Sequence, residues 1–401
     1  MMVPERPSLE RRVLAALDGS SGGGPRIPVV LGGCGTGRTS LLLRLRDLIG
    51  RTQAQYVDVE RIATTPERFF QALRESSPFP AHSYGQGNGS EPGARDAFDA
   101  ALAVLDTVRA PGTMPATFLL DEFLELRTFE SFPGLRSCLR DLVGVLASSG
   151  NRFVLTSRYV ARAHRLLRDA PSKFEIIQVA PLSAAEIRAT LPGAHGDDHV
   201  RGIDDPEEEV ERQRDEIAAL VQALSDGRPS YARAIAETAA GMSPRGAADP
   251  VSALASLLAP GGQLAQSCRF SYELRLHRAR GYGALKAILE VLAQEEPLTL
   301  TEIAHRLRRT PGSTKDYLSW LEDVDLIVSR QKRYSYVDPM LRLWVRLHCR
   351  AVPPGEEDIA RELHAYVQAR LPHGEPALAL AGSPATLGAE REKNWGIIEI
   401  D

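Results

Sequence analysis

The stretch Gly32-Gly33-Cys34-Gly35-Thr36-Gly37-Arg38-Thr39 decides the fold of this chain. It lies between the apolar run 27–31 and the run 40–49, whose apolar residues have helical spacing, so the sequence predicts a strand, a glycine-rich loop and a helix. In that setting a loop of pattern G-x-x-x-x-G-K-[ST] holds nucleotide phosphates with its backbone N–H groups and the helix N-terminus. The Thr39 hydroxyl is then placed for Mg²⁺. The alternative interpretation is a tight glycine-rich turn that holds no ligand.

One position departs from this pattern. Arg38 stands where the pattern has lysine, and its planar, forked guanidinium is bulkier than a compact ammonium group. The positive charge of Arg38 favours phosphate binding. Because the shape of the group differs from that of lysine, the sequence does not predict efficient hydrolysis of the nucleotide. Only five of the 48 basic residues are lysines, so a general preference for arginine is a second explanation of Arg38.

Two further strands are predicted to end in charged side chains. Thr117–Asp121 is followed directly by Glu122, so a buried strand ends in two adjacent carboxylates. We expect Asp121 to hold the Mg²⁺ shell and Glu122 to orient the attacking water. The run 152–157 predicts another strand, after which Arg158 is a candidate to contact the terminal phosphate; the alternative is a surface arginine paired with an acid.

The order of these segments predicts an α/β fold. Strands alternate with helices, which indicates a parallel sheet with helices on both faces and a ligand at the carboxyl ends of the strands. We expect an N-terminal helix at 1–20, a P-loop nucleotide-binding domain at 21–180, a helical lid at 181–262, a winged-helix domain at 263–350, and a last helix with a disordered tail at 351–401. The Ser-, Pro- and Gly-rich run 76–93 predicts a mobile insertion.

Composition limits the classes of protein that the chain can represent. The 401 residues are 43% hydrophobic and 25% charged, as in soluble globular proteins, and the net charge of −4 gives no overall reason to bind polyanions. The four cysteines lie far apart, which argues against zinc sites and a disulfide framework and fits a reducing cytoplasm. Neither a signal peptide nor a membrane span is predicted.

The motifs together resemble a known family. The runs 32–39, 118–122, 155–158 and 227–229 are similar to the signal-transduction (STAND) branch of the AAA+ ATPases, in particular the archaeal-type ATPases, which also occur in bacteria. In related immune switches a strand-end Thr-x-Arg and a Gly-x-Pro turn contact the γ-phosphate and the adenine. The resemblance implies these contacts for Arg158 and Pro229, although the turn before Pro229 is otherwise an ordinary helix-to-helix turn.

The resemblance implies ATP and Mg²⁺ as cofactors, and ATP hydrolysis to ADP and phosphate as the reaction. The expected catalytic residues are Glu122, Arg38 and Arg158, and the expected metal ligands are Thr39 and Asp121. The expected nucleotide-binding residues are Gly32, Gly33, Cys34, Gly35, Thr36, Gly37, Arg38, Thr39, Ser40 and Pro229.

The segment 283–350 resembles a winged helix-turn-helix. Three amphipathic stretches precede two short strand patterns around the wing residues 331–333. Six basic residues are expected near one surface: Arg306, Arg308, Arg309, Arg330, Lys332 and Arg333. The helix expected to read DNA, however, carries the acids Asp316, Glu322 and Asp323 against Lys315 alone, which suits neither base edges nor phosphates. A protein-docking or intramolecular winged helix is therefore preferred to one that binds duplex DNA.

Three functions remain open at this point. The first is a nucleotide-dependent switch with slow hydrolysis that positions the winged helix for a protein partner or a second copy of the chain. The second is a DNA-associated ATPase, and the third is a scaffold that binds no nucleotide. The apolar residues of 394–401 suggest a peptide that adds to a partner's sheet or groove, with a nonfunctional tail as the alternative.

Overall fold

The computed structural model describes residues 6–20, 22, 24–80, 93–191, 207–242, 249–277 and 281–371. Residues 81–92, most of the predicted insertion, and residues 372–401, the predicted tail with its terminal peptide, lie outside the described residues.

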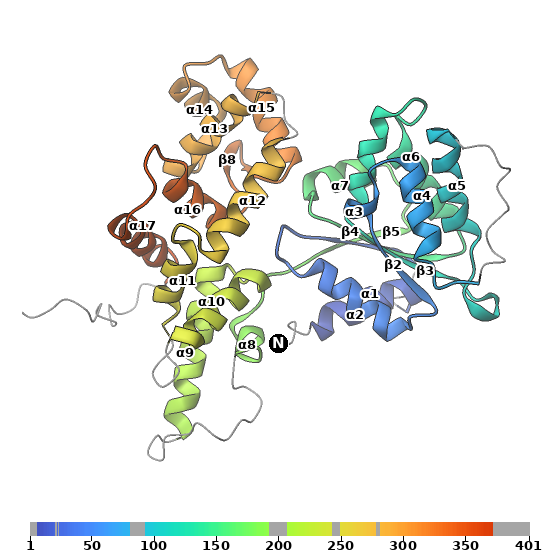
Figure 1. Ribbon diagram of the computed structural model, residues 1–401, viewed down its shortest axis with the longest axis horizontal. Helices are drawn as coiled ribbons and strands as arrows, with labels where there is room; N and C mark the ends of the chain where they lie inside the picture. The colour runs from blue at the N-terminus through green and yellow to red at the C-terminus, as the bar shows by residue number, and fades with distance from the viewer. Residues whose placement is uncertain are drawn as a thin grey trace, which may run out of the picture. The chain divides into compact units, whose positions relative to one another are not determined.

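A five-stranded parallel sheet forms the N-terminal part of the chain (Figure 1). Its strands are β1 (Ile27–Leu31), β2 (Ala54–Asp58), β3 (Thr117–Asp121), β4 (Arg152–Ser157) and β5 (Phe174–Gln178), in the order β2-β3-β4-β1-β5. Because β3, β4 and β1 are neighbours and all run the same way, their carboxyl ends lie side by side. The α/β fold class predicted from the sequence is confirmed.

Helices cover both faces of this sheet (Figure 1). On one face α1 (Pro7–Asp18) and α2 (Arg38–Ile49) form a core with one set of alternate strand residues, including Val30 of β1 and Leu119 of β3. The other set faces a larger core, which includes residues of α4 (Pro66–Glu75), α5 (Ala94–Thr107), η3 (Phe123–Ser131), α6 (Cys138–Ser148) and α7 (Val160–Leu167). Strands that are buried on both faces explain the continuous apolar runs in the sequence.

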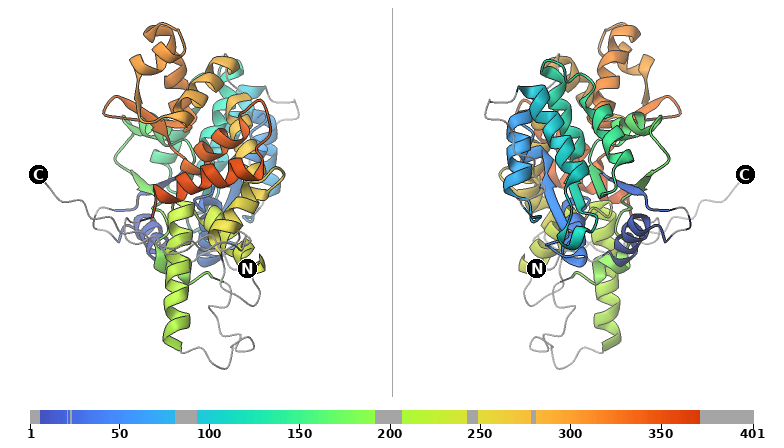
Figure 2. Two further views of the ribbon diagram at one scale, coloured as in Figure 1. Left: turned by 90° about the vertical axis from the view of Figure 1, so that its left-hand side faces the viewer. Right: turned by 90° about the vertical axis from the view of Figure 1, so that its right-hand side faces the viewer.

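Helices follow the sheet up to residue 277. They are α8 (Ala184–Arg188), α9 (Glu207–Ser225), α10 (Pro229–Met242), α11 (Pro250–Leu258) and α12 (Gln263–His277). Ser183 and Glu186 form the capping box that starts α8. Helix α9 is one uninterrupted helix, drawn in yellow-green in Figure 2. A short α3 (Val59–Ile62) and a turn, η2 (Pro111–Thr113), complete the elements before α8.

The next segment has the element order of a winged helix. Helices α13 (Tyr282–Gln294), α14 (Leu300–Arg306) and α15 (Pro311–Asp323) are combined with an antiparallel sheet of order β6-β8-β7. Its strands are β6 (Leu298–Thr299), β7 (Ile327–Arg330) and β8 (Arg333–Tyr336). Two strands were predicted; β6 is a third. Helices α16 (Pro339–His348) and α17 (Glu356–Gln368) follow.

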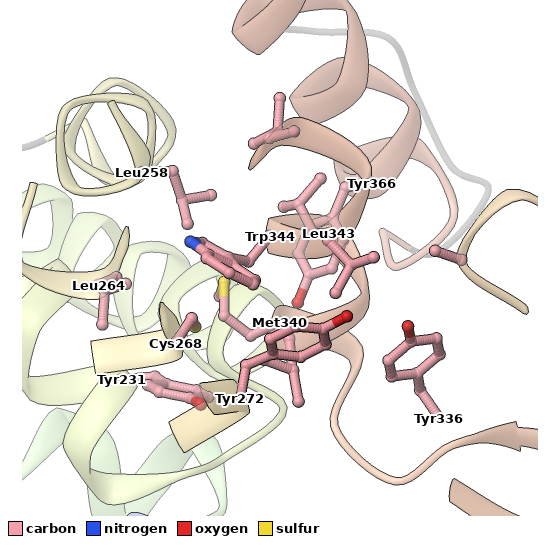
Figure 3. Packing of buried hydrophobic residues seen from close by; sticks show 14 of the residues in the cluster. Tyr231, Leu258, Leu264, Cys268, Tyr272, Tyr336, Met340, Leu343, Trp344 and Tyr366 are labelled. Carbon is pink, nitrogen blue, oxygen red and sulfur yellow. The ribbon is translucent and has the colours of Figure 1, made fainter. Parts of the chain in front are cut away.

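Helices α8 to α12 and the following segment, α13 to α17, share one hydrophobic core. Tyr231 of α10, Tyr272 of α12 and Trp344 of α16 all belong to it (Figure 3), and the Tyr272 and Trp344 ring centroids are 5.3 Å apart. Tyr366 of α17 belongs to the same core and donates a hydrogen bond to Leu224 O at 2.9 Å. Within the described ranges, no helix combines the length and the apolar character needed to cross a membrane.

Candidate functional site

The glycine loop joins β1 to α2 at the carboxyl edge of the sheet. Gly35 has φ +76°, and a Cβ there would collide with the Ser230 hydroxyl, so glycine is required. Gly37 has φ +88° and is the N-cap of α2, but it has no side chain to accept from the first N–H groups of the helix. Those N–H groups and the helix dipole favour an anion at this point, so the loop fits a phosphate group.

Arg38 is the first residue of α2 and is turned back toward the loop. Its Nη1 donates to Gly33 O at 2.6 Å, and its Nη2 forms an ion pair with Glu122. The side chain is 8% exposed, so this pair is screened little by water. Arg38 thus links the loop to the end of β3.

Asp121, the last residue of β3, accepts hydrogen bonds from two sides at its Oδ2. The Thr39 Oγ1 lies 2.7 Å away and the Tyr56 hydroxyl 2.9 Å away, while Thr156 of β4 donates to Oδ1. A carboxylate beside a hydroxyl supplies the hard oxygen ligands that Mg²⁺ takes together with nucleotide phosphates. Within the described ranges there is no cluster of three His, Cys, Asp or Glu side chains suited to a metal. Thr39 and Asp121 therefore fit a cation that is shared with a phosphate.

Glu122 is held on both of its carboxylate oxygens. Oε1 accepts from Arg38, and Oε2 accepts from the backbone N–H of Arg158 at 2.9 Å and lies 3.3 Å from Arg158 Nε. Its backbone has φ +55°, a left-handed conformation that is uncommon for a residue with a side chain and that clusters at functional sites. The sequence predicted Glu122 and Arg158 in one site, but not that two guanidiniums hold this carboxylate.

Arg158 is buried among acids. Besides Glu122 it forms an ion pair with Glu60, and its Nη2 lies 3.6 Å from a Glu125 oxygen. Arg158 is 8% exposed, and Glu122 and Glu125 are buried, so pairing with acids, the alternative weighed from the sequence, occurs mainly inside the protein; only Glu60 is exposed.

Pro229 begins α10 and lies against the loop. Its Cγ is 3.8 Å from the position that a Cβ of Gly37 would take, and the backbone N–H of Ser230 donates to Gly35 O at 3.2 Å. Gly32 follows β1, and its backbone N–H donates to Ser157 O; Thr36 Oγ1 donates to Gly33 O at 2.9 Å.

Two arginines that sequence reasoning did not select also reach the loop. Arg228, the middle residue of the Gly-x-Pro turn, donates to Cys34 O at 3.2 Å and to Val337 O at 3.0 Å, and it pairs with Asp338 at 3.2 Å. Arg275 of α12 donates from Nη2 to Cys34 Sγ at 2.7 Å. The Gly-x-Pro motif could have pointed to Arg228, whereas nothing in the local sequence marks Arg275.

The parallel sheet, the glycine loop and the carboxylates beside it form an α/β fold with a loop suited to phosphate, and this fold is similar to that of a known ATPase. The Walker-type ATPase PABY2304 of Pyrococcus abyssi has a similar structure, with a TM-score of 0.59 and 16% identity over 86% of this chain and 96% of that chain. At this identity the similarity establishes the fold alone. The resemblance described from the sequence is therefore confirmed for the fold.

Other similar structures have lower scores. The Aeropyrum pernix Orc1 protein in complex with DNA has a TM-score of 0.41 at 15% identity, covering 92% of this chain and 95% of that chain. The Thermotoga maritima RuvB Holliday junction branch migration motor has a TM-score of 0.39 at 10% identity, covering 83% and 92%. No protein-family model and no curated protein matches the sequence.

Proposed function

We propose that this protein is a nucleotide-dependent switch that binds ATP with Mg²⁺ and hydrolyses it slowly. The observation that carries the proposal is the position of the Glu122 carboxylate between the guanidiniums of Arg38 and Arg158. A carboxylate that is hydrogen-bonded at both oxygens is a poor base for orienting water, because those bonds must first be broken. The same guanidiniums lie where a triphosphate needs positive charge.

The proposal assigns a role to each part of the site. The loop 32–37 and the start of α2 hold the phosphates, and Thr39 and Asp121 hold Mg²⁺, which supplies charge neutralisation on the phosphates. Arg38 is attracted by both Glu122 and the phosphates, so occupancy of the loop competes with the ion pair. Pro229 packs on the adenine, and Arg158 distinguishes the terminal phosphate.

The contacts of the winged helix support the switch over a DNA reader. Asp323, near the end of α15, forms an ion pair with Arg165 of α7, and the Asp325 carboxylate accepts from the backbone N–H of Val160 at 2.6 Å. One of the three acids of the helix expected to read DNA, Asp323, is thus used within the chain, and so is Asp325 just after that helix. We propose that the lid, 181–262, and the winged-helix domain, 263–350, pass the state of the nucleotide to a protein partner or a second copy.

Thermal unfolding with nucleotide tests this function. A ligand at 100 times its Kd stabilises a protein by about 2.7 kcal/mol, so ATP with Mg²⁺ should raise the melting temperature clearly, and ADP should do so as well. Steady-state phosphate release should then fall below about 1 s⁻¹, the low end of ordinary enzyme turnover. A melting temperature that neither nucleotide changes would favour the scaffold without nucleotide.

A second candidate, a DNA-associated ATPase, has one observation in its favour. The six basic residues predicted near one surface of the winged helix are partly or fully exposed. Two of them are partly neutralised, because Arg306 pairs with Glu295 and Arg333 lies 3.7 Å from a Glu302 oxygen. Binding of duplex DNA that weakens steeply with salt, and that is lost in a Lys332→Glu variant, would support this candidate.

A further inference from the structure

Cys34, in the glycine loop, differs from the other three cysteines of the chain. It is partly exposed, as is Cys349, whereas Cys138 and Cys268 are buried. Burial raises the pKa of the Cys138 thiol to about 11 and also raises the pKa of Cys268 and Cys349. Burial acts in the same direction on Cys34, but nearby arginines, Arg275 foremost, outweigh it and lower the pKa of this thiol.

The geometry around Cys34 accounts for this difference. Arg275 Nη2 lies 2.7 Å from Cys34 Sγ, and the Ser271 hydroxyl of the same helix lies 4.0 Å from it. The other charged groups that face the loop are the guanidiniums of Arg38 and Arg158, which are both paired with Glu122, and of Arg228, which is paired with Asp338. Every charged group in direct contact with Cys34 is therefore positive, which favours the thiolate.

Arg275 needs a negative partner at this position. The residue is 8% exposed, and its Nε finds no acceptor. Its Nη1 donates to the backbone carbonyl of Asp325 at 3.0 Å. The Asp338 and Asp325 carboxylates act on its charge from further away, and within the described ranges no carboxylate forms an ion pair with its guanidinium. A buried cation that has no ion-pair partner in contact is costly, so the sulfur at which Nη2 is aimed is stabilised as an anion.

We propose that Cys34 is a modification site: its thiolate, held by Arg275, is the sulfur of this chain that hydrogen peroxide oxidises first, and the product weakens nucleotide binding. The sulfur attacks one peroxide oxygen, an S–O bond forms, the O–O bond breaks, and the second oxygen leaves as hydroxide. Sulfur loses two electrons and the peroxide gains them, giving a sulfenic acid. The added oxygen enters the contact of the loop with Arg275 and Ser271 and moves the loop away from its phosphate-binding geometry. The effect on nucleotide rests on the proposed function, whereas the order of oxidation does not.

The first experiment measures which cysteine reacts. The reduced full-length protein is treated with hydrogen peroxide, sulfenic acid is trapped with dimedone, and each cysteine is quantified by mass spectrometry over a pH series around the ordinary thiol pKa of about 8.5. Cys34 should be labelled at least about tenfold faster than Cys349, which is also partly exposed, near neutral pH, with a half-maximal rate at a lower pH. Equal rates, or faster labelling of Cys349, would overturn the proposal without any variant.

Variants test the part played by Arg275. Arg275→Gln should slow labelling of Cys34 and move its pH profile upward, Arg275→Lys should restore much of the rate, and Cys349→Ser should change neither. An unchanged pH profile in folded Arg275→Gln protein would show that the guanidinium does not hold the thiolate.

The last measurement links oxidation to nucleotide. The affinity for a fluorescent ATP analogue should fall several-fold, about tenfold at full modification, after peroxide treatment and recover after dithiothreitol, while Cys34→Ser protein should not respond to peroxide. Fully oxidised Cys34 with unchanged affinity would refute the effect on binding. A protein that binds no nucleotide even when reduced would refute the proposed function, and the labelling order would still decide the fate of Cys34.

Discussion

Replacing Arg38 by lysine should make hydrolysis faster. Arg38 uses its two terminal nitrogens at once, one for Gly33 O and one for Glu122, and a single ammonium group cannot span both acceptors in the same way. One hydrogen bond to a charged group contributes about 1.5–3 kcal/mol, and lysine should give up roughly half of that at Glu122. Half of that range is about 0.75–1.5 kcal/mol, which corresponds to an increase in kcat of roughly fourfold to tenfold. Arg38→Ala should instead lose ATP affinity, because the phosphates lose a positive charge.

The assay is steady-state phosphate release at saturating ATP and Mg²⁺, with the Kd for ATP measured separately. Arg51→Lys is a matched control, because Arg51 pairs with Asp47 at 2.8 Å, is 72% exposed and lies away from the loop. The reasoning is refuted if the wild-type protein already turns over at ordinary ATPase rates and Arg38→Lys is no faster. Arg38 would then be a competent replacement for lysine, and slow hydrolysis would lose its main support.

Three other predictions follow from the structure: one for Asp121 and Glu122, one for Arg158 and one for Asp325. Asp121→Ala should weaken Mg²⁺-dependent ATP binding, whereas Glu122→Gln should leave binding nearly intact and abolish hydrolysis; equal loss of binding in both, by calorimetry, would contradict the separate roles. Arg158→Ala should reduce the ratio of ATP to ADP affinity more than it lowers ADP affinity, and an unchanged ratio would count against the γ-phosphate contact. Burial raises the pKa of Asp325 to about 7, above its unfolded value of about 3.9, so the native state holds a proton that the unfolded chain has lost. This contribution to stability is complete below about pH 4 and falls as the pH rises to about 7, so Asp325→Asn should flatten the pH dependence of unfolding in that window by roughly 1 to 4 kcal/mol.

The central strands of the large sheet, β1, β3 and β4, could be predicted because most of their residues are apolar and are buried on both faces. Val30 and Leu31 of β1 face opposite cores, as alternation along a strand requires, and the continuous run marks the element without reference to the rest of the chain. Strand β6, by contrast, contains only Leu298 and Thr299 and is too short for any periodicity. Its pairing with β8 depends on tertiary packing and could not be predicted.

The residues of the candidate site also fall into two groups, those that local sequence predicts and those that only tertiary packing brings together. The loop residues and the Asp121–Glu122 pair follow from local pattern, since each motif is continuous in sequence. The ion pair of Arg38 with Glu122 joins residues 84 apart, and the contact of Arg275 with Cys34 joins residues 241 apart. Which of 48 basic residues reaches the loop is set by how the helices pack, and a single sequence carries no trace of that packing.

The core shared by α10, α12, α16 and α17 has a practical consequence for dissecting the protein into fragments. A fragment that starts at residue 263 would leave Tyr272 and Trp344 without Tyr231 and Leu258, and would expose an apolar face of the kind that drives aggregation (Figure 3). Residues 181–371 should therefore be expressed as one piece. Limited proteolysis of the intact chain should release that piece whole, by cleavage in the 179–183 connection, before it separates the winged helix from the helices that precede it.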